Sequence, residues 1–180
     1  MTAPIIVGVG GNLPTEAFGP PRATCGAALF YLSETPGIAI SACAKWYETA
    51  PVPISDQPWF VNGAVAIETD RSPEDLMALL LDVEARFGRE RGERNAARIL
   101  DLDLLVFGDR VLTGDPEVPH PRLHTRAFAL MPIRDLAAGW RHPKLGRPVE
   151  DLIADLPGDQ EIREMPEAGG YLGTEWKPPE

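Results

Sequence analysis

The sequence predicts an α+β fold, a ferredoxin-like sandwich in which helices pack on an antiparallel sheet. Patterns typical of strand, helix, strand, strand, helix and strand follow one another along the first part of the chain. A length of 180 residues suits one domain with a hydrophobic core. We expect this domain to cover residues 1–156. Residues 157–180 contain the pairs Gly169-Gly170 and Pro178-Pro179, and we expect them to form a loosely ordered C-terminal tail.

The first elements are apolar runs separated by residues that form turns. Residues 5–10 are apolar and end in glycines, which predicts a buried strand. Apolar residues at helical spacing predict a helix over about residues 20–34. Strands are expected at 38–47 and 59–68, and the prolines between them predict an irregular binding loop at 48–58.

The next helix has a clear start signal. Ser72 can cap it and Pro73 suits its first position. A charged loop over residues 89–97 then leads into a strand at 98–108. A short helix is expected later, over residues 127–136.

The strand at 98–108 carries the strongest indication of chemistry. Its leucines alternate with Asp101 and Asp103, so both carboxylates lie on one face, about 7 Å apart. Such a pair can hold hard cations, and Mg²⁺ that also binds phosphates needs only one or two protein carboxylates. A half-buried strand with an acidic outer face is the alternative, because the motif is short. Arginines just upstream favour a bound polyphosphate with its metal; they are Arg89, Arg91, Arg94 and Arg98.

The strand at 59–68 places Phe60 and Asn62 on one face. An asparagine beside an aromatic ring can hydrogen-bond the edge of a heterocycle while the ring stacks on it. A hydrogen bond from Asn62 to a neighbouring loop is an equally good interpretation.

Residues 118–128 are too rich in proline to form a strand. Pro121 also argues against a helical metal site built from His120 and His124. Phosphate contacts or hydrogen bonds within the loop are better interpretations of the basic residues here. These residues are His120, Arg122, His124 and Arg126.

Composition narrows the classes of function. The net charge of −10 argues against a general nucleic-acid binder. No apolar run is long enough to span a bilayer, and the first residues do not resemble a signal peptide. Cys25 and Cys43 have no metal-ligand spacing and suggest buried thiols in a reducing compartment. We therefore expect a cytoplasmic protein that acts on small molecules and binds neither nucleic acid nor membranes.

Four stretches occur in a fixed order between about residues 5 and 143. They are Gly10-Gly-Asn-Leu13, Tyr47-Glu-Thr-Ala-Pro51 with Asp56-Gln-Pro-Trp-Phe-Val-Asn62, Arg98-Ile-Leu-Asp-Leu-Asp-Leu-Leu-Val-Phe-Gly108, and the basic segment at 118–128. Together they resemble the 6-hydroxymethyl-7,8-dihydropterin pyrophosphokinases of folate biosynthesis. Any one stretch is modest support, and the ordered set is specific.

The resemblance implies a Mg²⁺-dependent enzyme that transfers the β,γ-diphosphate of ATP to the hydroxymethyl group of the pterin and releases AMP. ATP is then the co-substrate, and two Mg²⁺ ions are held by Asp101 and Asp103. The residues implied to contact the pterin are Gly10, Thr49, Val52, Phe60, Asn62 and Phe128. Those implied to face the nucleotide are Glu84, Arg89, Arg91, Arg98, His120 and Arg126. The implied catalytic set is Arg89, Arg98, Asp101 and Asp103.

The chain departs from the family just before the Asp-x-Asp strand. Arg94-Asn-Ala-Ala-Arg98 replaces the common Arg-Trp-Gly-Pro-Arg, so Asn95 stands where the tryptophan of a mobile lid is expected. Phe60 stands where a tyrosine is often found, and it keeps the stacking ring. The altered lid leaves one alternative, a non-catalytic relative that binds a pterin or a nucleotide.

Overall fold

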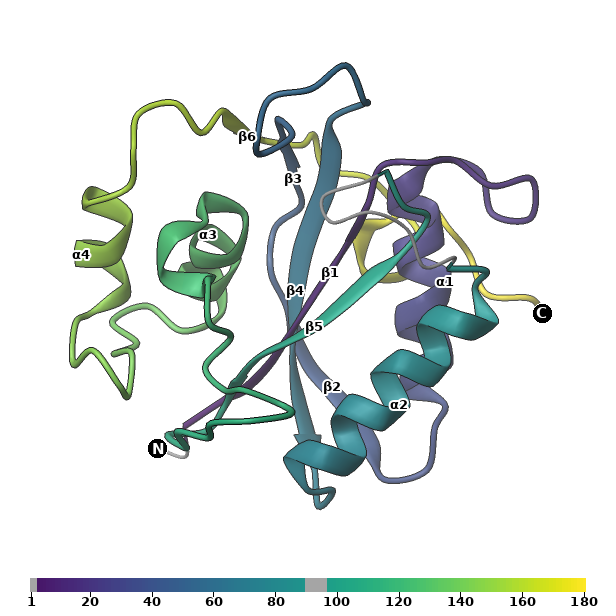
Figure 1. Ribbon diagram of the computed structural model, residues 1–180. Helices are drawn as coiled ribbons and strands as arrows, with labels where there is room; N and C mark the ends of the chain where they lie inside the picture. The colour runs from purple at the N-terminus through teal and green to yellow at the C-terminus, as the bar shows by residue number, and fades with distance from the viewer. Residues whose placement is uncertain (1–2, 90–96) are drawn as a thin grey trace.

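A computed structural model describes residues 3–89 and 97–180 and shows three layers (Figure 1). Helices α1 (Pro21–Ser33) and α2 (Pro73–Arg86) cover one face of a central sheet. Helices α3 (Ala127–Leu136) and α4 (Val149–Ala154) cover part of the other face. The expected α+β class is therefore confirmed. The strands are β1 (Ile5–Gly11), β2 (Ile38–Cys43), β3 (Tyr47–Thr49), β4 (Phe60–Thr69), β5 (Asp101–Phe107) and β6 (Ile162–Glu164).

The sheet is antiparallel at every described pairing. Its strand order is β5-β1-β4-β3-β6, and β2 also pairs with β4. The prediction of a single strand at 38–47 is wrong, because the chain forms β2 and β3 with a break between them. Ala44 N still donates to Ala64 O at 2.9 Å. The Trp46 ring fills the space beside Gly63, where a Cβ atom would approach it to 2.7 Å.

The central strand β1 separates two hydrophobic cores. Val7 and Val9 pack toward α1 and α2, whereas Ile6 packs toward α3 and α4. Leu102 and Leu104 of β5 share the core with Val7 and Val9. The predicted alternation of β5 is therefore confirmed, and its two aspartates face the side of the sheet that carries α3.

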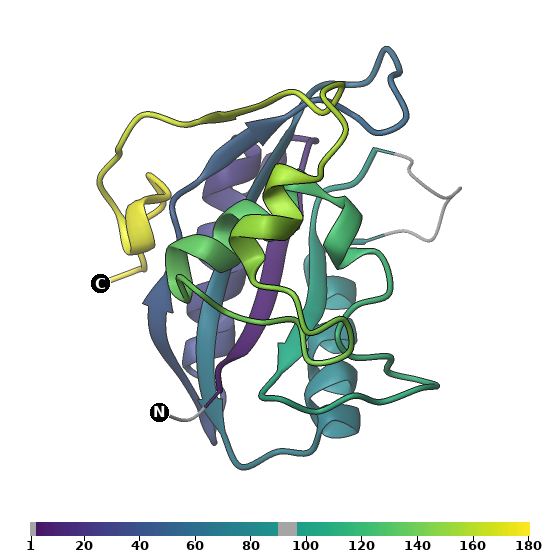
Figure 2. The same ribbon diagram turned by 90° about the vertical axis from the view of Figure 1, so that its left-hand side faces the viewer.

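The C-terminal segment crosses the molecule, as the two views show (Figure 1 and Figure 2). Strand β6 pairs with β3, and Trp46 Nε1 donates to Leu172 O at 3.0 Å. Buried Arg22 on α1 donates to Pro166 O and forms an ion pair with Glu175, both at 2.9 Å. Apolar residues of this segment also pack on the core; they are Met165, Tyr171 and Leu172. The domain boundary at 156 and the degree of order stay predictions.

Among residues 3–89 and 97–180, no helix is both long enough and apolar enough to cross a membrane.

Replacing Gly26 with alanine tests this packing. A Cβ atom at Gly26 would lie 2.0 Å from Oγ1 of the buried Thr174. We expect Gly26→Ala to lower the free energy of unfolding by about 1–3 kcal/mol in urea titrations, since overpacking strains the neighbours. A second substitution, Thr174→Gly, should remove much of that loss. If the C-terminal segment did not pack on α1, Gly26→Ala would instead raise the free energy of unfolding by about 1 kcal/mol, because alanine favours the helix more than glycine does.

Candidate active site

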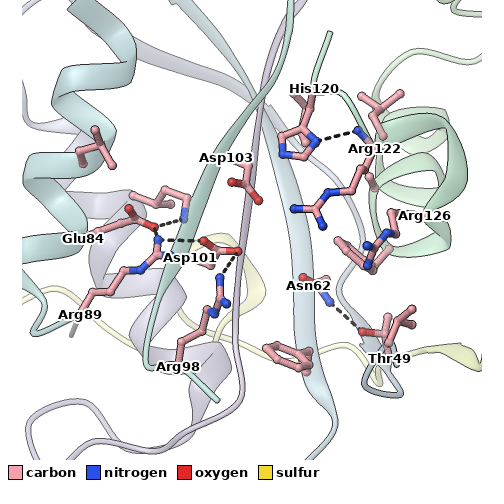
Figure 3. A pocket seen from close by; sticks show the side chains of 18 of the residues that line it. Thr49, Asn62, Glu84, Arg89, Arg98, Asp101, Asp103, His120, Arg122 and Arg126 are labelled. Carbon is pink, nitrogen blue, oxygen red and sulfur yellow. Dashed lines mark hydrogen bonds and ion pairs between the residues drawn. The ribbon is translucent and has the colours of Figure 1, made fainter. Parts of the chain in front are cut away.

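A cavity of about 440 Å³ lies on the sheet face beside α3 (Figure 3). Its walls come from the loop after β3, the end of α2, the segment before α3, and α3 itself. Most of the predicted site residues line it: Thr49, Val52, Phe60, Asn62, Glu84, Arg89, Arg98, Asp101, Asp103, His120, Arg126 and Phe128. Gly10 lies in the adjoining strand β1, and Arg91 lies outside the described residues.

The floor of the cavity depends on glycine in the central strand. Gly10 pairs with Asn62 on one side and with Asp101 on the other. A Cβ atom at Gly10 would approach Asn62 Oδ1 to 2.4 Å. Gly8, two residues earlier, pairs with Asp103 in the same way. The glycines make room for neighbouring side chains, since Asn62 lies over Gly10 and Leu105 lies over Gly8, and both of these side chains line the cavity.

Glu84 connects the end of α2 with strand β5. Its carboxylate is 2 % exposed and accepts a hydrogen bond from Leu102 N at 2.8 Å. Since β5 is the edge strand, this carboxylate takes the place of a strand partner. Glu84 also accepts a hydrogen bond from Arg89. Burial raises the pKa of Glu84 to about 7, opposed by the Leu102 N–H and by Arg89 and reinforced by Asp101.

The two aspartates of β5 have different surroundings. Arg89 Nη1 lies 3.0 Å from Asp101 Oδ1, and Arg98 Nη1 lies 3.4 Å from Asp101 Oδ2. The pKa of Asp103 is raised to about 8, first by burial and then by the charges of Asp101 and Glu84. The ionised form of Asp103 is therefore unfavourable in the metal-free protein, and a bound cation would stabilise it.

This pair of carboxylates fits a hard cation. Asp101 and Asp103 offer oxygen ligands, which Mg²⁺ prefers. In the described part of the chain, no group of three or more histidine, cysteine, aspartate and glutamate side chains is arranged to hold a metal ion. A cation at this pair would therefore complete its coordination with water or with the oxygens of a ligand.

A basic wall faces the carboxylates across the cavity. Figure 3 shows Arg122 and Arg126 on the side away from Glu84 and Arg89. Burial and the charge of Arg122 lower the pKa of His120, and His120 Nδ1 accepts a hydrogen bond from Arg122 N at 3.2 Å. The ring is then neutral, and its Nε2–H is a donor.

Arg122 also lines the cavity; the sequence pattern offered it as a phosphate contact or a loop residue, and the residues implied by the family resemblance did not include it. Its position between His120 and Arg126 was a usable signal, because all three now line the same wall. The apolar lining was also not predicted from sequence; it consists of Ala50, Met77, Leu81, Leu102, Leu105, Leu123 and Ala129.

Asn62 joins β4 to β3 within the cavity. Its Nδ2 donates to Thr49 Oγ1 at 2.8 Å, and the two strands pair around it. The hydrogen bond to a neighbouring segment, one of the two interpretations from sequence, is therefore present. It holds the amide in one orientation at the cavity surface, where Figure 3 shows it beside Thr49. Contact with a heterocycle stays a prediction.

Buried Asn12 connects the loop before β4 to the segment at Arg98. It belongs to the stretch Gly10-Gly-Asn-Leu13, but its role was not predicted from sequence. Its Nδ2 donates to Gln57 Oε1 at 3.0 Å and to Pro58 O at 2.9 Å, in the loop before β4. Its Oδ1 accepts from Arg98 N at 2.9 Å. One side chain thus positions the loop relative to the arginine that contacts Asp101.

Fold and cavity together define a class: an α+β protein in which paired carboxylates and several guanidinium groups surround one cavity, as a metal-bound polyphosphate requires. The family model described as 7,8-dihydro-6-hydroxymethylpterin-pyrophosphokinase matches residues 6–138. The chain belongs to this family.

Several bacterial proteins named 2-amino-4-hydroxy-6-hydroxymethyldihydropteridine pyrophosphokinase are similar to the chain. The protein of Pseudomonas aeruginosa is 38% identical over 154 residues, covering 85% of this chain and 91% of the relative. That of Synechocystis sp. is 36% identical over 152 residues, covering 84% and 75%. That of Methylorubrum extorquens is 36% identical over 154 residues, covering 83% and 91%.

The acidic cluster predicts how stability depends on pH. Native pKa values of about 7 for Glu84 and about 8 for Asp103 exceed those of free carboxyl groups, near 4. The metal-free protein should therefore lose stability as pH rises from about 4 to about 8, because the unfolded chain gives up these protons more easily. Thermal unfolding in a chelator at pH 5 and pH 8 measures this loss.

The same measurement on Asp103→Asn isolates one carboxylate. We expect this variant to be more stable than the natural protein at pH 8, by about 1–3 kcal/mol, and to depend less on pH. The control is Asp109→Asn, at an exposed position just beyond β5. If the stability of both variants depends on pH to the same extent, Asp103 is not the carboxyl group that causes this dependence.

Proposed function

We propose that the protein transfers the β,γ-diphosphate of ATP to the hydroxymethyl group of 6-hydroxymethyl-7,8-dihydropterin and releases AMP, as a step of tetrahydrofolate biosynthesis. One observation carries this proposal. Residues from separate segments, which the family resemblance assigns to the pterin, the metal and the phosphates, line a single cavity. Membership in the pyrophosphokinase family does not favour the alternative of a non-catalytic relative.

The pterin occupies the part of the cavity formed by β3, β4 and the start of α3. Phe60 and Phe128 both line it, and each offers a ring face for stacking. Asn62, oriented by Thr49, hydrogen-bonds the heterocycle edge. Gly10 lies beneath Asn62 and leaves room for that side chain to face the ring.

The triphosphate of ATP lies between the carboxylates of β5 and the basic wall. Arg89 and Arg98 lie on the side of the carboxylates. The opposite wall carries His120, Arg122 and Arg126. Asp101 and Asp103 would hold two Mg²⁺ ions, which would neutralise phosphate charge and lower the pKa of the substrate hydroxyl. The phosphates would then give these arginines anionic partners in addition to the protein groups that they contact.

In the reaction, the pterin hydroxymethyl oxygen forms a bond to the β-phosphorus. The bond from that phosphorus to the oxygen shared with the α-phosphate breaks, and AMP leaves with this oxygen. Such a transfer needs positioned reactants and compensated charge more than a covalent intermediate. The guanidinium groups supply this compensation as charge shifts toward AMP. The hydroxyl proton passes to water, and no dedicated general base is needed because bound Mg²⁺ ions would lower the pKa of the hydroxyl.

We also propose that the core has the ferredoxin-like arrangement expected from sequence. Its support is the chain order β1-α1-β2-β4-α2-β5 combined with the antiparallel sheet order β5-β1-β4-β2.

A product assay tests the function directly. ATP, Mg²⁺ and 6-hydroxymethyl-7,8-dihydropterin should yield AMP and the pterin diphosphate in equal amounts. Pterin binding without AMP formation would favour the non-catalytic relative.

Asp103→Ala should reduce the rate of AMP formation by at least about 100-fold, because it removes one of two metal ligands. Its fold should persist, since the side chain lies on a polar face. The control Asp109→Ala removes an exposed carboxylate just beyond the same strand and should keep the natural rate. Near-normal turnover of Asp103→Ala would disprove the metal assignment.

Asn62→Ala should weaken pterin binding about tenfold in calorimetry and leave ATP affinity within about twofold, because one or two hydrogen bonds to the ring edge are lost. Glu68→Ala, at an exposed position on the same strand, serves as the control. A larger effect on ATP than on the pterin would mean that the two subsites are assigned wrongly.

A further inference from the structure

Gln160, just before β6, makes two hydrogen bonds around a cavity residue. Its Oε1 accepts from Ala127 N at 2.8 Å, and its Nε2 donates to Thr125 O at 2.7 Å. These two backbone groups flank Arg126, which lines the cavity. Gln160 lies beyond residues 6–138, the part of the chain that the family model matches.

The backbone at Arg126 needs such support. Arg126 is extended, with φ −122° and ψ 115°, between a 3₁₀ turn (Leu123–Thr125) and α3. It precedes α3 as the N-cap and provides no side-chain cap. The N–H of Ala127 is one of those that a helix leaves without an internal partner. The carboxamide of Gln160 supplies that partner and also holds the preceding carbonyl.

The side chains carried by this backbone belong to the proposed site. The Arg126 guanidinium lies 5.7 Å from the centre of the Phe128 ring. In the proposed function, the Arg126 guanidinium faces the triphosphate and the Phe128 ring stacks on the pterin. A change in the backbone at Arg126 therefore reaches both subsites at once.

The next residue of the C-terminal segment contacts another wall of the cavity. Glu161 O accepts from Ala50 N at 3.0 Å, and Ile162 pairs with Thr49 across β6 and β3. Thr49 in turn orients Asn62. The consecutive residues Gln160 and Glu161 thus connect the start of α3 to the cavity wall formed by β3.

We propose that Gln160 is a positioning residue for the transfer, an inference that rests on the proposed function. It holds Arg126 and Phe128 in place relative to Thr49 and Asn62 before the substrates bind. Positions set in advance reduce the cost of ordering these groups during the reaction.

The test compares Gln160→Ala and Gln160→Glu with Arg163→Ala in the full chain. Gln160→Glu keeps the size and the acceptor but loses the donor to Thr125 O. Arg163 lies on β6 and contacts Glu48, away from the cavity lining. The readouts are amide hydrogen exchange over residues 123–130, KM for ATP and for the pterin, kcat and Tm.

Gln160→Ala should exchange the Ala127 amide at least about tenfold faster, as expected for loss of its acceptor, whereas Gln160→Glu keeps this acceptor and should stay within about threefold of the natural exchange rate. A change in the kinetics is expected in both variants, because both lose the donor to Thr125 O. KM for both substrates should rise about fivefold or more, with a smaller fall in kcat. Tm should stay within about 3 °C of the natural protein. Arg163→Ala should match the natural protein in exchange over 123–130 and in both KM values.

The outcomes separate this inference from the proposed function. Natural protein that forms no AMP would overturn the proposed function. Natural activity combined with unchanged KM values in both Gln160 variants would overturn the positioning role alone, whatever the exchange rates. A fall in Tm with unchanged KM values would identify Gln160 as a helix cap only and would equally overturn the inference.

Discussion

The structure depends on three carboxylates held close together at one edge of the sheet. Glu84 reaches β5 from α2, and Asp101 and Asp103 project from β5 itself. Their mutual repulsion and partial burial raise the pKa values of Glu84 and Asp103. Arg89 bridges Glu84 and Asp101, so the cluster is only partly compensated by protein groups. Such an arrangement is unfavourable for folding and favourable for binding a cation with phosphates.

The fold tolerates this cluster because the surrounding sheet is well buried. Core residues pack against both faces of β1, and two helices cover the face opposite the cavity. Helices α3 and α4 cover only part of their face, and at the cavity floor the glycines of β1 make room for the side chains of Asn62 and Leu105. Strained acidic groups therefore sit on a rigid surface, a common feature of functional sites.

Long-range hydrogen bonds position the irregular segments of the site. Asn12 connects the loop before β4 to Arg98, and Gln160 connects the C-terminal segment to the start of α3. Loops have little intrinsic order, so contacts of this kind decide where their side chains lie. The lining of the cavity is thus divided between regular strands, which carry the two aspartates, and loops, which carry much of the positive charge.

Local patterns in the sequence determined the regular elements. The alternation around Asp101 and Asp103 placed both on one strand face, and the helix at 127–136 matches α3 in its bounds. The same local reasoning failed at 38–47, because the break between β2 and β3 depends on Trp46 packing beside Gly63 from another strand.

The family motifs also identified most residues of the cavity from the sequence alone, because their spacing reflects the same sheet. Tertiary structure alone decided how these residues are connected. Glu84 bonds the edge of β5, Arg122 joins the basic wall, and Gln160 supports Arg126 across 34 residues of chain (160 minus 126). These relations depend on which segments meet in space, and a pattern read along one segment carries no information about its partner.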